Sequence, residues 1–186
     1  MVYSIVAYGD PVLRKKAQEI DKDYPELDKF IANMFDTMYA SSGVGLAAPQ
    51  VGKSIRVFVV DGEPFAEDDE TMVKFKKAFI NPIITHEEGE KWAFNEGCLS
   101  IPKIREDVER HEKLTITYYD ENWVQHTEEY DGLKARIIQH EYDHLEGILF
   151  IDKLNPLKRK LLQGKLNDIT RGKVRTDYKM RFPKLK

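Results

Sequence analysis

The chain has 186 residues, of which 41% are hydrophobic and 33% charged, and its formal net charge is -3 at pH 7. A chain of this length can bury a sizeable core without disulfides, so we expect one domain, or one domain with a tail. The single cysteine, Cys98, excludes an internal disulfide, which fits a reducing compartment. No apolar stretch is long enough to cross a bilayer, and the first residues do not form a signal peptide, so we expect no membrane partner.

The first forty residues predict short strands followed by a helix. Residues 1–20 contain strand-like pieces broken by a turn at Gly9-Asp10-Pro11. Asp23 is the expected N-cap of the helix, Pro25 lies in its first turn, and the helix runs to about Ala40. Its hydrophobic residues recur at helical spacing, as in a helix packed on a core: Leu27, Phe30, Ile31, Met34, Phe35 and Met38.

A glycine-rich stretch, GVGLAAPQ, occupies residues 43–50. Its two glycines let a backbone approach a ligand closely, although an ordinary connection between elements can have the same composition. The stretch lacks the lysine and the helix entry of a phosphate-binding loop, so that function is excluded. Gln50, which follows a proline, offers a side-chain amide.

The middle of the chain predicts β-structure. Residues 55–60 are β-branched or aromatic except for Arg56, which is typical of a buried strand, and the largely polar residues 61–77 predict a loop. A strand over residues 79–85 is interrupted by Asn81-Pro82, so we expect it to be an edge strand or a bulged one. Further on, two strand patterns predict a hairpin, over residues 114–119 and 124–130.

The last third of the chain predicts two helices. The first begins after Asp131, as the expected N-cap, and stops near Gly147. A short strand is expected over residues 149–151. Pro156 opens the second helix, whose leucines we expect on one side: Leu157, Leu161, Leu162 and Leu166.

The first of these helices carries the sequence QHEYDH at residues 139–144. His140 and His144 are four residues apart, so on a helix both imidazoles lie on one face and can reach one ion. Glu141 adjoins the first histidine and is placed to act on a water molecule as a general base. This HExxH pattern also occurs by chance on surface helices, so the pattern alone leaves both interpretations open.

Two histidines leave a metal ion short of ligands, and Cys98 is the candidate for a third. Three protein ligands would leave an open position for water, as in a hydrolase. A closed structural site would need a fourth ligand, for which His86, His111 and His126 are available, although none lies in a convincing motif. Cys98 could also be a small buried residue without a metal role. The residues therefore leave two alternatives: a metal hydrolase, for example a zinc peptidase, or a non-catalytic protein with a structural metal, which could be an RNA-binding module.

Three motifs in this order resemble those of the peptide deformylase family: GVGLAAPQ at 43–50, EGCLS at 96–100 and QHEYDHLEG at 139–147. The opening GDPVLR at 9–14 is also similar to the start of that family, and the resemblance covers roughly residues 1–165. It implies a metal-dependent hydrolase that removes the formyl group from the N-terminal formylmethionine of new polypeptides and releases formate. N-formylmethionyl peptides are therefore the expected substrates.

The resemblance also implies how the matching residues act at the metal. Cys98, His140 and His144 would hold one divalent ion per chain, with Fe2+ as the physiological ion and Zn2+, Ni2+ or Co2+ as possible replacements. Glu141 would first be the general base and then the general acid. Ligand types alone favour zinc, so the sequence only partly limits the metal.

The substrate would meet residues from all three motifs. The resemblance places the Gln50 side-chain amide and the Leu99 backbone N–H beside the formyl oxygen, and the Gly45 backbone against the substrate. Arg105 could contact the substrate backbone, or join Glu96 and Asp143 in orienting the ligands. From their positions near the motifs, we expect four hydrophobic residues to line the methionine pocket: Val44, Phe94, Leu133 and Ile137.

The chain is unusually basic after Asp152, where two aspartates stand against twelve cations: Lys153, Lys158, Arg159, Lys160, Lys165, Arg171, Lys173, Arg175, Lys179, Arg181, Lys184 and Lys186. This is either a solvated helix face with a tail or a contact with an anionic surface such as ribosomal RNA. We expect no DNA partner and a bacterial, cytoplasmic location.

These observations predict an α+β fold. Mostly antiparallel sheets would surround a central HExxH helix, with a C-terminal helix packed outside. The expected division is a deformylase-like catalytic domain over residues 1–166 and a basic tail over residues 167–186.

Overall fold

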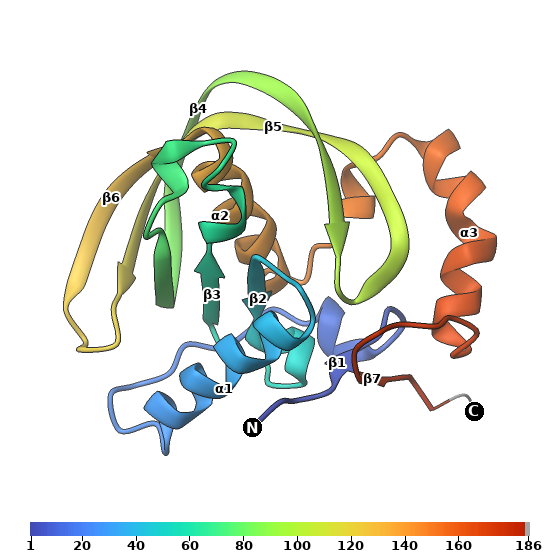
Figure 1. Cartoon of the computed structure of the whole chain (residues 1–186), viewed down its shortest axis with the longest axis horizontal. Coiled ribbons are helices and arrows are strands. Elements are labelled where there is room, and N and C mark those ends of the chain that lie inside the picture. Colours follow the sequence, from blue (N-terminus) through green and yellow to red (C-terminus); the bar gives the residue numbers. More distant parts are fainter. Residues whose placement is uncertain (185–186) are drawn as a thin grey trace.

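The computed structural model of the chain describes residues 1–184 and has an α+β fold, as predicted. Its main sheet has five antiparallel strands in the order β2-β3-β4-β5-β6 (Figure 1). The bounds of these strands are Gly45–Ala47 for β2, Val57–Asp61 for β3, Lys76–Cys98 for β4, Ile101–Tyr119 for β5 and Gln125–Asp131 for β6.

The long strands β4 and β5 curve over helix α2, Gly132–Leu145, so this helix lies within the fold of the sheet (Figure 1). The helix and the sheet share one hydrophobic cluster. Phe58 and Phe79 from the sheet stack with ring centroids 4.6 Å apart, and Ala135 and Ile138 from α2 are fully buried against the same cluster. Every residue of β3 is buried, as the apolar run over residues 57–60 predicts.

The other two helices cover different regions of the sheet. Helix α1, Leu27–Ala40, packs with β2 and β3 in a second hydrophobic cluster. Helix α3, Pro156–Thr170, lies at the outer edge of the molecule against β5, where the curved strands descend (Figure 1). Within residues 1–184, no helix is both long enough and apolar enough to cross a membrane.

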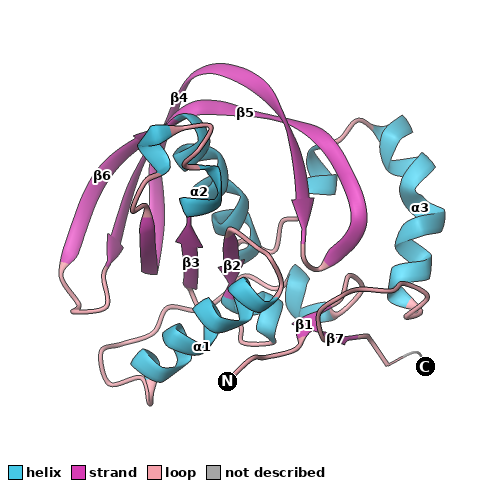
Figure 2. Cartoon of the chain, viewed as in Figure 1, coloured by secondary structure: helices cyan, strands magenta, loops and turns pink. Residues whose placement is uncertain are grey.

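The two ends of the chain meet in a small parallel sheet. Strand β1, Ile5–Val6, pairs with strand β7, Met180–Arg181, and the two lie side by side (Figure 2). The expected boundary after residue 166 falls inside α3. Residues 174, 178, 180 and 182 also pack against the buried clusters, so much of the segment that follows α3 belongs to the folded body.

Several local predictions were wrong, each for a physical reason. Helix α1 begins at Leu27 rather than after Asp23, because Glu26 has a left-handed backbone (φ 53°) that cannot continue a helix from Pro25. Residues 149–151 do not form a strand, because Leu149 is the N-cap of a 3-10 turn, Phe150–Lys153, that includes the other two residues.

The leucine stripe of α3 was also assigned incorrectly. Leu157 and Leu161 point away from the protein and are 67% and 74% exposed. The buried side of α3 is formed instead by Leu162, Leu166 and Ile169, which recur at intervals of four and three residues.

The region around Asn81-Pro82 is bulged, which was one of the two alternatives, but it does not lie at an edge. Strand β4 lies between β3 and β5, and its pairing with β5 shifts register between Ile80 and Ile83. The bulge accommodates the missing N–H of the proline within an internal strand. The hairpin over β5 and β6 is confirmed, with Tyr119 opposite Gln125.

Candidate active site

Helix α2 carries His140, Glu141 and His144 into the interior of the protein. Asp131 occupies the N-cap position, as predicted, although its side chain makes no capping hydrogen bond. The two imidazole rings have centroids 5.3 Å apart, and the His140 ring stacks on Phe150. Helical spacing therefore places both histidines on one face, and packing limits their rotation.

Cys98 meets the two histidines from the end of β4. Its Sγ lies 3.4 Å from Nε2 of His144, and the donor atoms of Cys98, His140 and His144 all lie within 4.8 Å of one another. Nδ1 of His140 lies 2.8 Å from Oε1 of Glu96, which leaves Nε2 of this ring to face the other two donors. A thiolate and two imidazoles are a suitable donor set for a divalent transition metal.

The electrostatics of this group also suit a cation. Burial opposes a charged His140, but hydrogen bonds to Cys98 and Glu96 outweigh it and raise the pKa of His140 to about 10. Burial, together with the charge of His140, lowers the pKa of His144 well below its usual value, so this ring is neutral. The group thus stabilises positive charge, and His140 would give up its Nε2 proton to act as a ligand when a divalent ion supplies that charge instead.

Glu141 has the properties of a general base. It is buried, and burial raises the pKa of its carboxyl to about 7. Its Oε2 has no hydrogen-bond partner within residues 1–184. A buried carboxylate oxygen without a partner is costly unless something else binds there, and a water or substrate proton would satisfy it. A pKa near neutrality lets the group both accept and donate a proton.

Gly45 and Gln50 come from the glycine-rich stretch, which forms β2 and a 3-10 turn, Ala48–Val51. A Cβ at Gly45 would lie only 2.5 Å from Oε1 of Glu141, so any side chain at this position would displace the Glu141 carboxylate. The Oε1 atom of Gln50 accepts a hydrogen bond from Ala47 N–H at 3.0 Å. That bond turns the amide nitrogen of Gln50 toward Cys98 Sγ, 3.4 Å away, and Ser100 Oγ, 3.3 Å away.

A cavity of about 420 Å³ opens onto this group, and all nine predicted catalytic and substrate-binding residues line it: Val44, Gly45, Gln50, Phe94, Leu99, Arg105, Leu133, Ile137 and Glu141. Cys98 and His140 also reach its wall. Residues far apart in the sequence are thus brought to one concave, partly apolar site, as expected for a small-ligand pocket.

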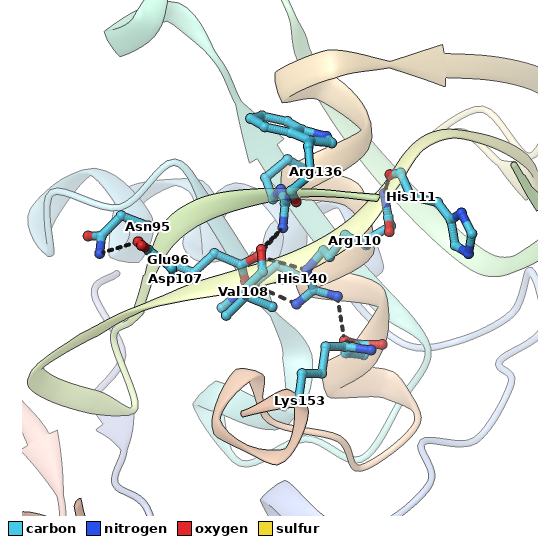
Figure 3. Close-up of polar contacts among 12 residues, drawn as sticks. Asn95, Glu96, Asp107, Val108, Arg110, His111, Arg136, His140 and Lys153 are labelled. Atoms are coloured by element: carbon cyan, nitrogen blue, oxygen red, sulfur yellow. Dashed lines mark hydrogen bonds and ion pairs between the residues drawn. The ribbon is translucent and has the colours of Figure 1, made fainter. Parts of the chain in front are cut away.

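Behind the histidines, Glu96 is the centre of a buried ionic network (Figure 3). It accepts two hydrogen bonds from Arg110, at 2.8 and 3.0 Å, one from Arg136 at 2.8 Å, and the contact with His140. Arg110 also donates to Asp143 at 2.7 Å. Glu96 and Asp143 therefore share Arg110, and the network fixes the orientation of the His140 ring.

Arg105 does not join that network. Its guanidinium donates to the side chain and the backbone oxygen of Asn95, at 2.8 and 2.9 Å, on an exposed part of the paired strands β4 and β5. The arginines that do join, Arg110 and Arg136, were not predicted. Arg136 lies one helical turn before His140, a spacing that could have indicated it, whereas Arg110 carries no local signal.

The remaining histidines lie away from the three donors. His86 contacts Glu88, His111 contacts the Gly89 carbonyl, and His126 contacts Asp120. In the part of the chain that the structure describes, the donor group contains three residues and no fourth. The arrangement matches an open, catalytic metal site better than a closed, structural one.

Comparison with known proteins agrees with this geometry. Residues 2–160 match the family described as polypeptide deformylase. A peptide deformylase from Christiangramia forsetii is 58% identical over 193 residues, covering 100% of this chain and 98% of the relative. The chain belongs to the polypeptide deformylase family.

Solved structures of deformylases share the fold. The crystal structure of peptide deformylase from Thermus thermophilus superposes with a TM-score of 0.82 at 38% identity, covering 92% of this chain and 99% of that one. For the deformylase from Thermotoga maritima, the TM-score is 0.75 at 42% identity, with 84% and 99% covered.

Polypeptide deformylases are metal-dependent enzymes that remove the N-formyl group from new polypeptides, and this is the activity of the chain. Membership decides between the alternatives that the residues left open, because it makes the protein a deformylating hydrolase rather than a zinc peptidase or a non-catalytic protein. The Cys98, His140 and His144 group is a possible metal site of this enzyme.

Proposed function

We propose that Cys98, His140 and His144 bind ferrous iron and that Glu141 transfers the protons during deformylation. One observation carries the assignment: three donor atoms within 4.8 Å of one another lie beside a buried carboxylate whose Oε2 has no partner within residues 1–184. When bound, a divalent ion supplies Lewis acidity, which lowers the pKa of a water molecule and polarises the formyl oxygen.

The formyl group is held by residues of two motifs. The Gln50 amide nitrogen, oriented by the bond from Ala47, and the Leu99 backbone N–H donate to the formyl oxygen, and Gly45 contacts the substrate through its backbone. A donor of this kind is typically worth about 3–4 kcal/mol when negative charge develops on the oxygen. Both donors belong to turns, so they are already in place when substrate arrives.

The methionine side chain occupies the apolar part of the cavity. Leu133 and Ile137 lie on the face of α2 that leads to His140, and Val44 and Phe94 complete the pocket. Arg105 lies at the cavity wall, where it can contact the backbone of the peptide.

Proton transfer at Glu141 completes the reaction. Its Oε2 takes a proton from the attacking water as the new C–O bond forms at the formyl carbon. Glu141 then gives that proton to the amine nitrogen as the C–N bond breaks, which releases formate and a free N-terminus. A pKa of about 7, raised by burial, suits a group that performs both steps.

The first test is formate release from formyl-Met-Ala-Ser by anaerobically purified protein, beside Glu141→Ala with its metal content measured. Release by the wild type, and its loss in a variant that retains metal, would support both the site and the base. If a fully metallated, folded wild type released no formate, the assignment would be abandoned.

Iron as the physiological ion has its own test. A ferrous site with a thiolate ligand is sensitive to oxygen. Activity should therefore decay in air when the enzyme is loaded with Fe2+ and persist when it is loaded with Ni2+, with chelation abolishing both. Equal stability of the two forms in air would argue against the ferrous assignment.

We also propose that the basic C-terminal region contacts ribosomal RNA, which would place the enzyme in the bacterial cytoplasm where formylated chains emerge. Arg159, Lys160 and Lys165 are exposed on α3 and form no ion pair within residues 1–184. Such a surface attracts phosphates in a salt-dependent manner.

Cosedimentation with ribosomes tests the contact. Lys160→Glu with Lys165→Glu should abolish a binding that weakens as salt rises. The control reverses Lys22 and Lys53, which are exposed outside this region, and so makes the same change in net charge. Absent or salt-insensitive cosedimentation, or equal loss in both variants, would refute the contact.

A further inference from the structure

The segment that follows α3 reaches the active site. Thr176, Asp177 and Tyr178 line the cavity, although the match to the family ends at residue 160. The Tyr178 hydroxyl donates a hydrogen bond of 2.8 Å to the Leu99 carbonyl oxygen, across 79 positions of sequence. The C-terminal segment therefore contacts the turn that carries both Cys98 and Leu99.

That turn needs outside partners. Cys98 pairs with Ile101, so Leu99 and Ser100 are the two residues of a tight reversal between β4 and β5. Their carbonyl oxygens lie outside the strand ladder, and backbone oxygens in a packed site need donors. Tyr178 supplies one to Leu99, and Tyr8 N–H supplies one to Ser100 at 2.8 Å.

Both donors are fixed by the same small sheet. Ile5 N–H donates to the Lys179 oxygen at 2.8 Å, and Ala7 N–H donates to the Arg181 oxygen at 2.9 Å. The Tyr178 ring packs in the cluster that contains α1, β2 and Leu99. Burial raises the pKa of Tyr178, so its hydroxyl remains protonated and able to donate.

We propose that Tyr178 is a positioning residue for deformylation. The N–H and C=O of Leu99 belong to the two peptide planes that flank its Cα. Holding the oxygen restricts rotation of the residue, and so limits the directions in which the Leu99 N–H can point at the cavity wall. The inference rests on the proposed role of that N–H as a donor to the formyl oxygen.

The test compares full-length Tyr178→Phe with the wild type, both loaded with Ni2+ and matched for metal content. Phenylalanine keeps the packing ring and removes the hydroxyl alone. A misplaced donor acts on charge that develops in the transition state, so kcat should fall about threefold to tenfold while KM changes less than twofold. Hydrogen exchange of the peptide containing residues 98–101 should become faster.

Two further variants separate positioning from general stability. Tyr24→Phe is the matched control, because this ring packs against the same cluster and its hydroxyl makes no hydrogen bond within residues 1–184. Its kcat, and its rate of hydrogen exchange in residues 98–101, should equal those of the wild type. Replacing Tyr178 by 4-aminophenylalanine restores a weaker donor, so kcat should lie between those of Tyr178→Phe and the wild type.

Three results would overturn the proposal: an unchanged kcat in Tyr178→Phe, unchanged exchange in residues 98–101, or an equal loss of kcat in Tyr24→Phe. If the unchanged kcat came with faster exchange, it would show that the Leu99 N–H does not act on the transition state. These results differ from a failure of the proposed metal site and base, because in that case the wild type itself would release no formate. Should Tyr178→Phe not fold, a kcat below wild type in the 4-aminophenylalanine variant supports the proposal, and an equal kcat overturns it.

Discussion

Gly45→Ala should inactivate the enzyme by moving its base. The backbone of Gly45 is not in a left-handed conformation, so alanine is compatible with its φ angle. The added Cβ, however, would lie 2.5 Å from Oε1 and 2.8 Å from the Cδ of Glu141. Real Cβ atoms do not approach heavy atoms this closely, so the carboxylate must retreat by about 0.5–0.9 Å.

A displacement of about 1 Å at a reacting group can cost roughly 100-fold in rate. We therefore expect kcat for formyl-Met-Ala-Ser to fall about 100-fold. Overpacking lowers the free energy of unfolding by about 1–3 kcal/mol. Alanine partly offsets this cost because it reduces the conformational entropy of the unfolded chain, so the variant should remain folded. The assay is formate release at saturating substrate, with metal content and thermal unfolding measured on the same sample.

Gly164→Ala is the matched control. A Cβ at Gly164 meets nothing within 4 Å, and the residue lies in α3, where alanine should stabilise the helix by up to about 1 kcal/mol. Its kcat should equal that of the wild type. If Gly45→Ala kept kcat within threefold of the wild type while folded and metallated, then the position of Glu141 would not be set by contact with this backbone.

Three further predictions concern the buried network and the pocket. Glu96→Gln should weaken metal binding about 10–100-fold, measured by chelator competition. It should also destabilise the fold by about 3–5 kcal/mol, measured by urea unfolding, because Arg110 loses a buried partner. Unchanged metal affinity would argue against a role of Glu96 in orienting the ligand His140. Burial would raise the pKa of Glu96, but hydrogen bonds from His140 and Arg110 hold it far below its usual value. The stability that this carboxylate contributes is therefore complete above about pH 4.3 and is lost as the pH falls, by up to about 1.4 kcal/mol per pH unit. Between about pH 5 and pH 3, the free energy of unfolding measured with urea should fall less in Glu96→Gln than in the wild type. Ile137→Arg should raise KM for methionyl substrates about 10–100-fold, because the arginine fills the apolar pocket. The control Val124→Arg, at an exposed position, should leave KM unchanged. Equal KM values in the two variants would place the methionine elsewhere.

Local patterns predicted the elements that carry the site. The helix with His140 and His144 follows from a spacing of four residues, which puts both imidazoles on one face whatever surrounds the helix. The β5–β6 hairpin follows from two alternating runs separated by a turn. Cys98 was a candidate ligand from its chemistry, and the motif order identified the family. Within the described residues, the fold brings the donor atoms of Cys98, His140 and His144 together.

The errors arose where an interaction is not local. Nothing near Glu26 indicates a left-handed backbone, and nothing in the leucine pattern of α3 tells which side faces β5. Arg110 was missed because its partner Glu96 lies on the preceding strand, fourteen positions away, and the long β4–β5 pairing contains several register shifts.

The sequence by itself therefore determined the chemistry of this protein: the donor types, their order along the chain, and the helix that presents two of them. Those features depend on side-chain identity and on helical spacing, which act over a few residues. Only the tertiary structure decided which charges surround Glu96, how closely Gly45 approaches Glu141, and that Tyr178 holds the Leu99 turn. Such contacts join residues up to 96 positions apart, and their register is set by the packing of the whole sheet rather than by any local pattern.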